Sequence, residues 1–328
     1  MRPDERRPVG RTAGRTEVTA LSFGGAAIGG LYAPVAAGQG ERAVRRALDL
    51  GMRYLDTAPH YGAGTSERIL GAALAGVPRD SFTISTKVGR LLRPRRPGEE
   101  PDDAGFAAEP PLKRVWDFSA DGVRRSLAGS LERLGLDRVD IVYLHDPDDH
   151  EDEVYAGAYP ALAELRDQGV VGAIGAGMNR TAMLTRFVRR LDLDVVLCAG
   201  RYTLLDQSAL ADLLSACAER GTAVVVGGVY NSGLLAGGTT YDYAPAPPAL
   251  RDRAARLAEV CAAHGVPLRA AALRFPLGHR AVASVLTGCR TVAEAEDNAA
   301  LFARDLPAGL WTDLREAGLL APAAPLPT

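Results

Sequence analysis

The sequence predicts an α/β protein with a (β/α)8 TIM barrel fold and long substrate loops at the C-terminal face of the barrel. Eight short apolar runs alternate with longer segments of helical periodicity, which indicates repeated strand–helix units. The runs are mostly apolar throughout, as expected of parallel strands buried on both faces. No G-x-G-x-x-G motif opens a helix after an early strand. A closed barrel is therefore favoured over an open dinucleotide-binding sheet.

The apolar runs give the bounds of the predicted strands: Leu21–Gly25, Met52–Asp56, Phe82–Thr86, Val139–Leu144, Val170–Gly175, Val195–Ala199, Thr222–Val226 and Val282–Thr287. Helical periodicity is clearest before two glycines, Gly51 and Gly135. The apolar positions are Ala43, Ala47 and Leu48 before the first, and Val123, Leu127, Leu131 and Leu134 before the second. Two segments rich in turn residues, Leu91–Pro111 and Gly237–Pro248, are predicted to be long loops, which are commonly functional.

Length and composition indicate a globular protein with a large core. We expect residues 1–328 to form a single barrel domain, with residues 1–9 disordered and residues 318–328 forming a C-terminal tail. Apolar residues make up 47% of the chain and charged residues 24%, typical of soluble proteins. The formal net charge of −2 argues against broad binding to nucleic acid or to an anionic membrane.

The targeting and redox signals favour the cytoplasm. No apolar run reaches the ~20 residues needed to span a bilayer. The segment Met1–Arg15 is rich in arginine but lacks the apolar region of a secretory signal. Four cysteines, without metal-binding or redox spacing, are expected to be reduced and mostly buried: Cys198, Cys217, Cys261 and Cys289.

Four residues that could move a proton lie at the C-terminal ends of predicted strands. Asp56, Lys87 and His145 end three consecutive strands, and Tyr61 follows on the adjoining loop. Chemistry in such barrels takes place at this face. An ammonium group favours the ionised form of a nearby phenol, a carboxylate can hold that ammonium, and an imidazole can orient the reacting oxygen. These residues suit proton transfer at a C–O bond, which would accompany hydride transfer from a cofactor.

Other roles for these residues are open from position alone. Any one of them could be a structural residue at the barrel rim. His60, His145, His150 and Asp56 could also suggest the ligands of a metal-dependent hydrolase. No H-x-H motif follows the first strand, so we expect no metal site. Glycines near strand ends, at Gly24, Gly25, Gly228 and Gly288, could admit a dinucleotide or could serve only as turn residues.

The motifs around these residues resemble the aldo/keto reductase family from about Gly10 to about Ala303. The resemblance rests on Gly51-Met52-Arg53-Tyr54-Leu55-Asp56-Thr57-Ala58, on Tyr61-Gly62 and on Arg133-Leu134-Gly135-Leu136-Asp137-Arg138-Val139-Asp140. It implies a barrel in which Tyr61 is the general acid/base and Lys87 lowers its pKa. It further implies that Asp56 anchors Lys87 and that His145 positions the substrate oxygen.

The same resemblance implies a site for NAD or NADP. Its residues would be Gly24, Gly25, Ala26, Asn179, Gly228, Tyr230, Ser232, Leu234, Gly288, Arg290, Glu294, Asp297 and Asn298. Asn179 would hold the nicotinamide carboxamide, and Asn298 would bond adenine. Many family members have glutamine, lysine and arginine where this chain has Ala199, Gly288 and Glu294. A glutamate would repel a 2′-phosphate, whereas Arg290 could pair with one. NAD is therefore slightly favoured, with NADP possible.

Three further motifs resemble a narrower group of the family: the L-fucose and D-threo-aldose 1-dehydrogenases, L-galactose dehydrogenase and pyridoxal 4-dehydrogenase. The motifs are Trp116-Asp117-Phe118-Ser119, His145-Asp146-Pro147-Asp148-Asp149 and Gly200-Arg201-Tyr202-Thr203-Leu204-Leu205. This resemblance implies oxidation of a cyclic aldose hemiacetal at C1 to a lactone. The substrate pocket would be lined by Tyr32, Tyr61, Trp116, Phe118 and Tyr202, although Trp116 and Phe118 could instead be packing residues.

Two other functions remain open. The chain could reduce a different aldehyde or ketone, since the same four residues serve both directions. It could also be a nucleotide-binding regulatory subunit without turnover. In every case we expect a small-molecule sugar or carbonyl partner and a monomer or homodimer.

Overall fold

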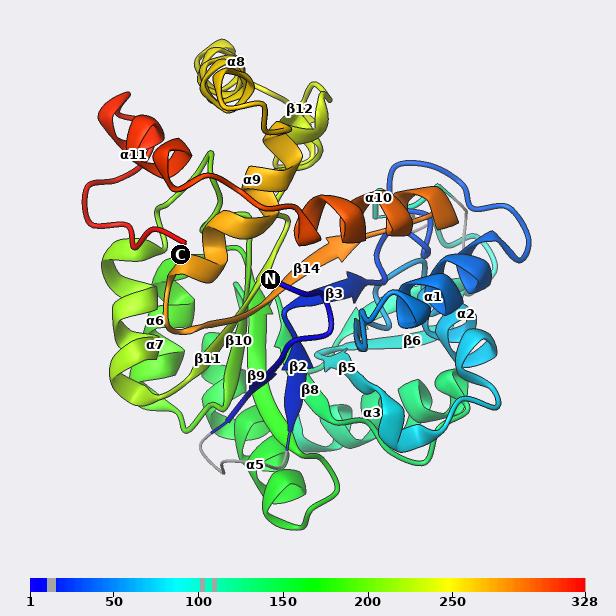
Figure 1. Ribbon diagram of the computed structural model, residues 1–328. Helices are drawn as coiled ribbons and strands as arrows, with labels where there is room; N and C mark the ends of the chain where they lie inside the picture. Colours follow the sequence, from blue (N-terminus) through cyan, green and yellow to red (C-terminus); the bar gives the residue numbers. More distant parts are fainter. Residues whose placement is uncertain (11–15, 101–103, 108–110, 328) are drawn as a thin grey trace.

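A computed structural model describes residues 1–10, 16–100, 104–107 and 111–327 of the chain. Eight parallel strands form a closed barrel in the order β3-β4-β5-β8-β9-β10-β11-β14, and β14 pairs with β3 (Figure 1). The strands are β3 (Leu21–Gly24), β4 (Tyr54–Asp56), β5 (Thr83–Val88), β8 (Ile141–His145), β9 (Ala173–Met178), β10 (Val195–Ala199), β11 (Ala223–Gly227) and β14 (Val282–Gly288). The predicted barrel fold is confirmed.

Helices surround the barrel (Figure 1). The α-helices are α1 (Gln39–Asp49), α2 (Thr65–Leu74), α3 (Ala120–Leu134), α4 (Glu151–Glu153), α5 (Tyr159–Asp167), α6 (Thr181–Arg190), α7 (Ser215–Arg220), α8 (Pro248–Ala263), α9 (Leu268–Arg274), α10 (Val292–Ala303) and α11 (Ala308–Glu316). Short 3-10 or π segments are η1 (Arg79–Ser81), η2 (Val154–Ala158), η3 (Leu210–Leu214), η4 (Leu234–Ala236) and η5 (Phe275–Gly278).

The predicted helix end at Gly135 has a clear local cause. Helix α3 begins where the Ser119 side chain accepts a hydrogen bond from the backbone N–H of Gly122. It ends at Gly135, which adopts the left-handed conformation with φ of 63°. Val123, Leu127 and Leu134 are buried on its inner face. The apolar spacing therefore identified both the buried face and the end of this helix.

The first nine residues are ordered, which corrects the expectation that they are disordered. Strand β1 (Arg6–Pro8) pairs antiparallel with β2 (Glu17–Thr19). Val9 and Val18 are buried in the same apolar cluster as Tyr54, Ile141 and other residues inside the barrel. Hydrophobic burial of these two valines therefore holds the N-terminal segment against the barrel.

Hairpins occur at both predicted loops, although the second strand of the first hairpin begins only after Pro111. In the first, β6 (Arg90–Pro94) pairs antiparallel with β7 (Leu112–Trp116); residues 101–103 and 108–110 of that segment lie outside the described residues. In the second, β12 (Thr240–Tyr241) pairs with β13 (Ala244–Pro245). Both hairpins follow barrel strands at their C-terminal ends, so they extend the face at which chemistry is expected.

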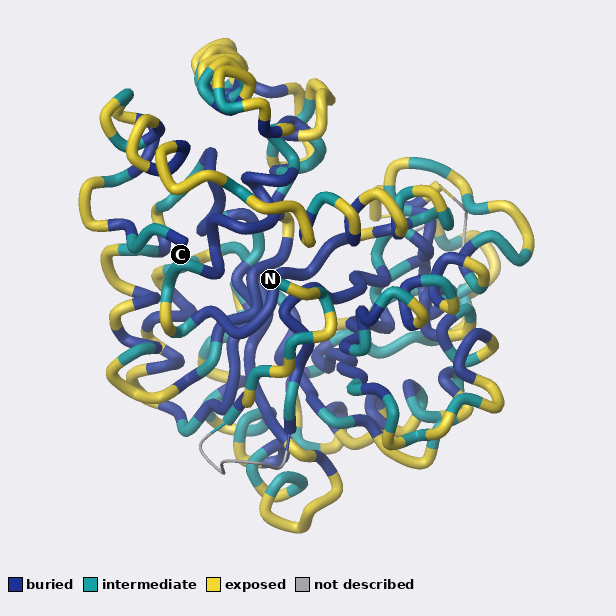
Figure 2. Tube along the Cα trace, viewed as in Figure 1, coloured by how far each residue is buried: buried dark blue, intermediate teal, exposed yellow. Residues whose placement is uncertain are grey.

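Buried residues are concentrated in the central strands and on the inner faces of the helices (Figure 2). The C-terminal segment, expected to be a tail, packs against the barrel through buried Leu319, Leu320 and Ala324. Among the described residues, no helix is both long enough and apolar enough to cross a bilayer.

Candidate active site

Adjacent strands bring the four proton-transfer candidates to one end of the barrel. Asp56 is the last residue of β4, Lys87 lies near the end of β5, and His145 ends β8. Strand β5 pairs with both β4 and β8. Tyr61 follows on the loop that leads from β4 to α2. We call Asp56, Tyr61, Lys87 and His145 the tetrad.

The centre of the tetrad is a buried ion pair. Lys87 Nζ donates to Asp56 Oδ2 at 2.6 Å and to the carbonyl oxygen of Thr57 at 2.9 Å. The side chains of Lys87 and Asp56 are only 2% and 1% exposed. Breaking such a pair would leave an unpaired buried charge, which costs several kcal/mol. The pair therefore fixes the position of the ammonium group.

A chain of hydroxyl groups supports Asp56 from inside the barrel. Ser85 Oγ donates to Asp56 Oδ1 at 2.7 Å, and the Tyr54 hydroxyl lies 3.0 Å from both Ser85 Oγ and the Tyr143 hydroxyl. The sequence analysis missed these residues. Each lies two positions before a tetrad member on the same strand, as in Tyr143 and His145, and side chains two apart point to the same side of a strand.

Tyr61 lies next to both Lys87 and His145. Lys87 Nζ is 4.6 Å from the centroid of the Tyr61 ring. The rings of Tyr61 and His145 are perpendicular, with centroids 5.7 Å apart. The predicted grouping of a phenol, an ammonium and an imidazole is therefore present in three dimensions.

The pKa of Tyr61 is shifted in the opposite direction to the one we expected. Burial raises this pKa well above its usual value near 10, and the carboxylates of Asp56 and Asp146 raise it further. Arg90, not Lys87, is the cation that lowers it. Tyr61 is therefore protonated at neutral pH.

Burial has the opposite effect on the two neighbouring histidines. It lowers the pKa of His145 well below its usual value, and Arg90 and Lys87 add to the effect. It lowers the pKa of His60 to about 2, again with contributions from Arg90, Arg114 and Lys87. Both imidazoles are neutral at physiological pH, so one ring nitrogen of His145 can donate a hydrogen bond and the other can accept one.

A cavity of about 400 Å³, here called the reaction cavity, opens at the tetrad. It is lined by Ala26, Leu31, Tyr32, His60, Tyr61, Lys87, Ala104, Gly105, Phe106, His145, Asp146, Gly177, Met178, Leu197, Ala199 and Tyr243. The rings of Tyr32 and Tyr243 lie 6.0 Å apart and both side chains are exposed. Tyr32 thus lines the cavity as predicted, and Tyr243 was not predicted.

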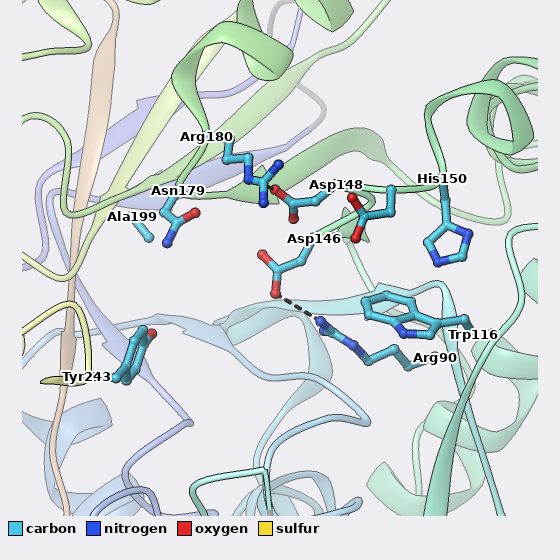
Figure 3. A pocket seen from close by; sticks show the side chains of 10 residues that line it. Arg90, Trp116, Asp146, Asp148, His150, Asn179, Arg180, Ala199 and Tyr243 are labelled. Atoms are coloured by element: carbon cyan, nitrogen blue, oxygen red, sulfur yellow. Dashed lines mark hydrogen bonds and ion pairs between the residues drawn. The ribbon is translucent and has the colours of Figure 1, made fainter.

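Figure 3 shows the residues that line a second cavity of about 400 Å³, here called the side cavity. Its lining residues are Arg90, Trp116, Asp146, Asp148, Asp149, His150, Asn179, Arg180, Ala199 and Tyr243. Three of them, Asp146, Ala199 and Tyr243, also line the reaction cavity. The two cavities are therefore parts of one cleft, with the tetrad at one end and a second group of charged side chains at the other.

Two of the five aromatic residues predicted to line the substrate pocket do not line this cleft. Phe118 is fully buried and stacks beneath Trp116, with ring centroids 5.8 Å apart. Tyr202 is also fully buried, against Phe275 and His279. Tyr202 therefore does not line the cleft as predicted, and Phe118 has the packing role that the sequence had left open for it.

The predicted cofactor residues near the barrel axis lie around the reaction cavity or have packing roles. Ala26 lines this cavity and Asn179 lines the side cavity. A Cβ atom on Gly25 would lie 2.5 Å from Ser66 Oγ, so this glycine is required for packing. Gly24 ends β3, and Gly228, with φ of 63°, follows β11. A Cβ atom would lie 3.4 Å from the Thr287 carbonyl oxygen at Gly24 and 3.3 Å from the Gly200 nitrogen at Gly228, so both glycines lie close to neighbouring backbone.

Asp297 and Asn298, predicted for the adenosine site, form a polar cluster at α10 with Tyr230, which was predicted for the pyrophosphate loop. The Tyr230 hydroxyl donates to Asn298 Oδ1 at 2.7 Å, and Arg269 Nη2 donates to the same oxygen at 3.0 Å. Arg269 also pairs with Asp297. Asn298 Nδ2 donates to Cys289 Sγ at 3.3 Å. The sequence analysis missed Arg269, because it lies on α9, away from the quoted motifs.

Glu294 caps a helix instead of facing outward. Its Oε2 accepts from the backbone N–H groups of Arg290 at 2.5 Å and Thr291 at 3.2 Å. Thr291 Oγ1 in turn accepts from the Glu294 N–H, which completes a capping box at the start of α10. A carboxylate therefore already lies at this helix N-terminus, where an anionic group would otherwise bind.

The loop after β11 connects to the second hairpin. Ser232 Oγ accepts from the backbone N–H of Tyr243 at 3.3 Å, and the Ser232 carbonyl oxygen accepts from Thr240 Oγ1 at 2.5 Å. Leu234 is buried beneath this loop. Arg290 Nη2 donates to the Leu31 carbonyl oxygen, while its buried Nε has no partner among the described residues.

The donor set fits a dinucleotide. An amide at Asn179 and a guanidinium donor at Arg290 suit carboxamide and phosphate groups. Among the described residues, no group of three His, Cys, Asp or Glu side chains is arranged to hold a metal ion.

Comparisons with known proteins extend along almost the whole chain. Residues 20–318 match the aldo/keto reductase family. The chain is 47% identical over 312 residues to a D-threo-aldose 1-dehydrogenase of a Pseudomonas species, which covers 92% of this chain and 95% of that protein. It is 40% identical to the pyridoxal 4-dehydrogenase of Microbacterium luteolum, covering 98% and 99% of the two chains. A solved aldo-keto reductase from Bacillus halodurans, in its holo form, superposes with a TM-score of 0.74 at 26% identity, covering 98% and 97%.

Proposed function

We propose that this chain, which belongs to the aldo/keto reductase family, oxidises a cyclic aldose hemiacetal at C1 to a lactone. The chain is an NAD(P)-dependent oxidoreductase. The observation that carries the proposal is the buried Lys87–Asp56 pair at 2.6 Å, with Tyr61 and His145 on the same cavity. The aldose substrate is supported by the high identity to a D-threo-aldose 1-dehydrogenase.

Each member of the tetrad has a defined part in moving a proton. Tyr61 would donate its phenol proton to a substrate carbonyl oxygen in reduction and accept the hydroxyl proton in oxidation. His145, held neutral by burial, would hydrogen-bond the same oxygen. Lys87 uses two of its three N–H donors on Asp56 and Thr57, which orients the ammonium toward the ring of Tyr61. Bound nicotinamide would supply the hydride chemistry that no side chain provides.

The adenosine end favours NAD over NADP in this proposal. Glu294 already accepts from two backbone N–H groups at the start of α10. A 2′-phosphate there would meet a carboxylate and would lose those donors. Gly288 offers no side-chain charge in compensation. In this proposal Asn298 and Tyr230 would lie against the adenine. Arg290 would pair with a phosphate group.

Two alternatives use the same geometry differently. A reductase of another aldehyde or ketone would need the same tetrad. A nucleotide-binding regulatory subunit would need only the cofactor site, and a complete tetrad speaks against it. We further propose a cytoplasmic location, supported by four free and buried cysteines, and a monomer or homodimer.

A substrate panel tests the proposal. We expect aldopentoses and aldohexoses to be oxidised with NAD at a higher kcat/KM than simple alcohols, measured by the absorbance of reduced nicotinamide. The NAD rate should match or exceed the NADP rate. A preference for NADP above about tenfold, or 1.4 kcal/mol, would refute the assignment of Glu294. Absence of aldose oxidation, with turnover of simple carbonyl compounds, would favour the reductase.

A further inference from the structure

The side cavity carries a function that the tetrad does not explain. It joins the reaction cavity at Asp146, Ala199 and Tyr243. The remainder is lined mostly by charged and polar side chains, which point into a shared space beside the tetrad (Figure 3). A hydride acceptor and a single carbonyl carbon would not require such a polar extension.

Arg90 is held in a fixed position within this cavity. Its Nη2 donates to Asp146 Oδ2 at 3.1 Å, and its guanidinium carbon lies 4.0 Å from the centroid of the Trp116 ring. The Arg90 side chain is only 11% exposed. Its Nη1 atom is buried and has no hydrogen-bond partner among the described residues. A buried N–H without a partner costs free energy, unless a ligand accepts from it.

Asp146 connects this guanidinium to the reacting centre. It follows His145 directly, and its Oδ2 lies 3.4 Å from His145 Nε2. Its backbone has φ of 43°, a conformation uncommon for residues other than glycine, which turns the chain at the end of β8. Oδ1 receives no hydrogen bond from the described part of the chain, and the side chain is 36% exposed. The carboxylate can therefore accept from a ligand in either cavity.

The Arg90–Asp146 contact differs from an ion pair built only for stability. Arginine and carboxylate commonly form two parallel hydrogen bonds, which satisfy both groups. Here a single N–H bonds a single oxygen, so one donor and one acceptor of these two cavity-lining residues have no hydrogen-bond partner in the described part of the chain. Trp116, which stacks on buried Phe118, supports the guanidinium from one side. The pair is thus held rigidly but left incomplete.

We propose that Arg90 and Asp146 form a subsite for the ring hydroxyl groups of a polyhydroxylated substrate. The inference rests on the proposed aldose oxidation and specifies how the ring is recognised. Asp146 accepts hydrogen bonds from one or two hydroxyls, and Arg90 Nη1 donates to a hydroxyl or ring oxygen. A ring bridging both groups would keep C1 at the tetrad, because Asp146 lines both cavities. Sites built to bond a hydroxyl discriminate strongly against analogues that lack it.

The test compares hydroxyl deletion in the substrate with substitution in the protein. Wild-type protein should lose about tenfold to a hundredfold in kcat/KM when an aldopentose is replaced by its deoxy analogues, as expected for hydrogen bonds to charged groups. Asp146→Asn and Arg90→Lys should lower kcat/KM for the parent sugar by a similar factor. In these variants, kcat/KM for at least one deoxy analogue should be less than about threefold below kcat/KM for the parent sugar. The substitution has already removed the hydrogen bond that the missing hydroxyl would make.

A surface variant and a binding measurement serve as controls. Asp137→Asn makes the same chemical change at a side chain that is 83% exposed. It should leave the ratios of kcat/KM between parent and deoxy sugars unchanged.

The two tryptophans allow a binding measurement, because Trp116 lies in the side cavity, whereas Trp311 is buried in the core. In Tyr61→Phe protein with NAD, fluorescence titration with the sugar therefore reports binding without turnover. Asp146→Asn in that background should weaken binding by the factor found in kcat/KM.

The outcomes separate this inference from the proposed function. If aldoses are oxidised but each hydroxyl deletion lowers kcat/KM by the same factor in wild type and in both variants, the subsite is refuted and aldose oxidation stands. Equal sugar affinity in the fluorescence titration with and without Asp146→Asn would also refute it. If wild type oxidises no aldose, the proposed substrate and the subsite both fail.

Discussion

Tyr61 shows how strongly its surroundings control a single phenol. Its proton is retained because burial and two carboxylates, Asp56 and Asp146, outweigh the effect of nearby cations on the pKa. Sequence alone placed a lysine beside this tyrosine and predicted a lowered pKa. It could not weigh the cost of desolvating a phenolate in a closed cavity, since burial depends on the complete fold. The closeness of Lys87 to Tyr61 was predicted correctly, but the direction in which the pKa of Tyr61 is shifted was not.

The raised pKa of Tyr61 gives a prediction about pH. Oxidation requires the phenol to accept a proton, and the ionised fraction grows up to tenfold per pH unit below the pKa. We expect kcat/KM for sugar oxidation to increase with pH throughout the range from about 6 to 10, without a plateau. Because burial lowers the pKa of His145 and of His60, neither should add an inflection near their ordinary value of about 6.5.

Initial rates of oxidation and reduction across this range check the pH prediction. Reduction should be almost independent of pH at saturating aldehyde, since Tyr61 remains protonated. A plateau in oxidation below about pH 8 would contradict the prediction, because it would mean that the tyrosine pKa is lowered.

At the scale of elements, the strands supply more of the site than its four obvious residues. Tyr54, Ser85 and Tyr143 each precede a tetrad member by two positions and join its hydrogen-bond network. This two-residue spacing was visible in the sequence. The sequence did not show that these residues share one side of the strand with the tetrad. A barrel strand is apolar on its outer face as well, so alternation does not indicate which side faces inward.

Strand β9 shows why one predicted boundary was displaced. The prediction began at Val170, whereas the strand begins at Ala173 and contains mostly small residues. A Cβ atom on Gly175 would lie 1.9 Å from the Val195 carbonyl oxygen, so close pairing with β10 requires glycine there. Strand propensity misses such a segment, because it rewards the larger β-branched side chains that this packing excludes.

Gly89 links the fold of the first hairpin to the proposed sugar subsite. Its φ is 111°, and a Cβ atom there would lie 2.3 Å from the Phe118 ring, which supports Trp116 and thereby Arg90. We expect Gly89→Ala to lower kcat/KM for aldoses by about tenfold or more and to destabilise the fold by about 1–3 kcal/mol. Steady-state kinetics and denaturant unfolding measure the two effects.

Gly76→Ala is the matched control for that variant. Gly76 also has positive φ, 79°, but a Cβ atom there would meet nothing within 4 Å. It should cost roughly 1 kcal/mol of stability from backbone strain and leave kcat/KM unchanged. Equal kinetics for the two variants would show that Phe118 does not support the subsite.

At the scale of the whole molecule, regular features were predictable and irregular ones were not. Continuous apolar runs located all eight barrel strands, and Val195–Ala199 matched at both ends. The tetrad followed from the rule that strand ends share one face. Most of the strand Arg90–Pro94 was predicted to be loop, because the segment from Leu91 to Pro111 is rich in proline, glycine, arginine and acidic residues. The strand carries Arg90, so the second group of charged side chains in the cleft was missed with it.

The predicted substrate contacts of Phe118 and Tyr202 are absent for a related reason. Phe118 and Tyr202 stand in motifs near the mouth of the barrel, but a loop residue can turn toward the cleft or beneath it. Only packing decides, and here both rings are fully buried. Trp116, which ends β7 two residues before Phe118, lines the side cavity. Sequence spacing therefore located the neighbourhood of the substrate but not its contacts.

The central claim is that the phenol of Tyr61 transfers the proton that accompanies hydride transfer. The most direct measurement is the rate of NAD reduction by an aldose in wild-type and Tyr61→Phe protein, together with the dissociation constant of NAD from each. We expect kcat to fall by about a hundredfold or more, the range of general acid–base catalysis, while the affinity for NAD changes little. A Tyr61→Phe protein that retains most of its kcat would contradict the claim.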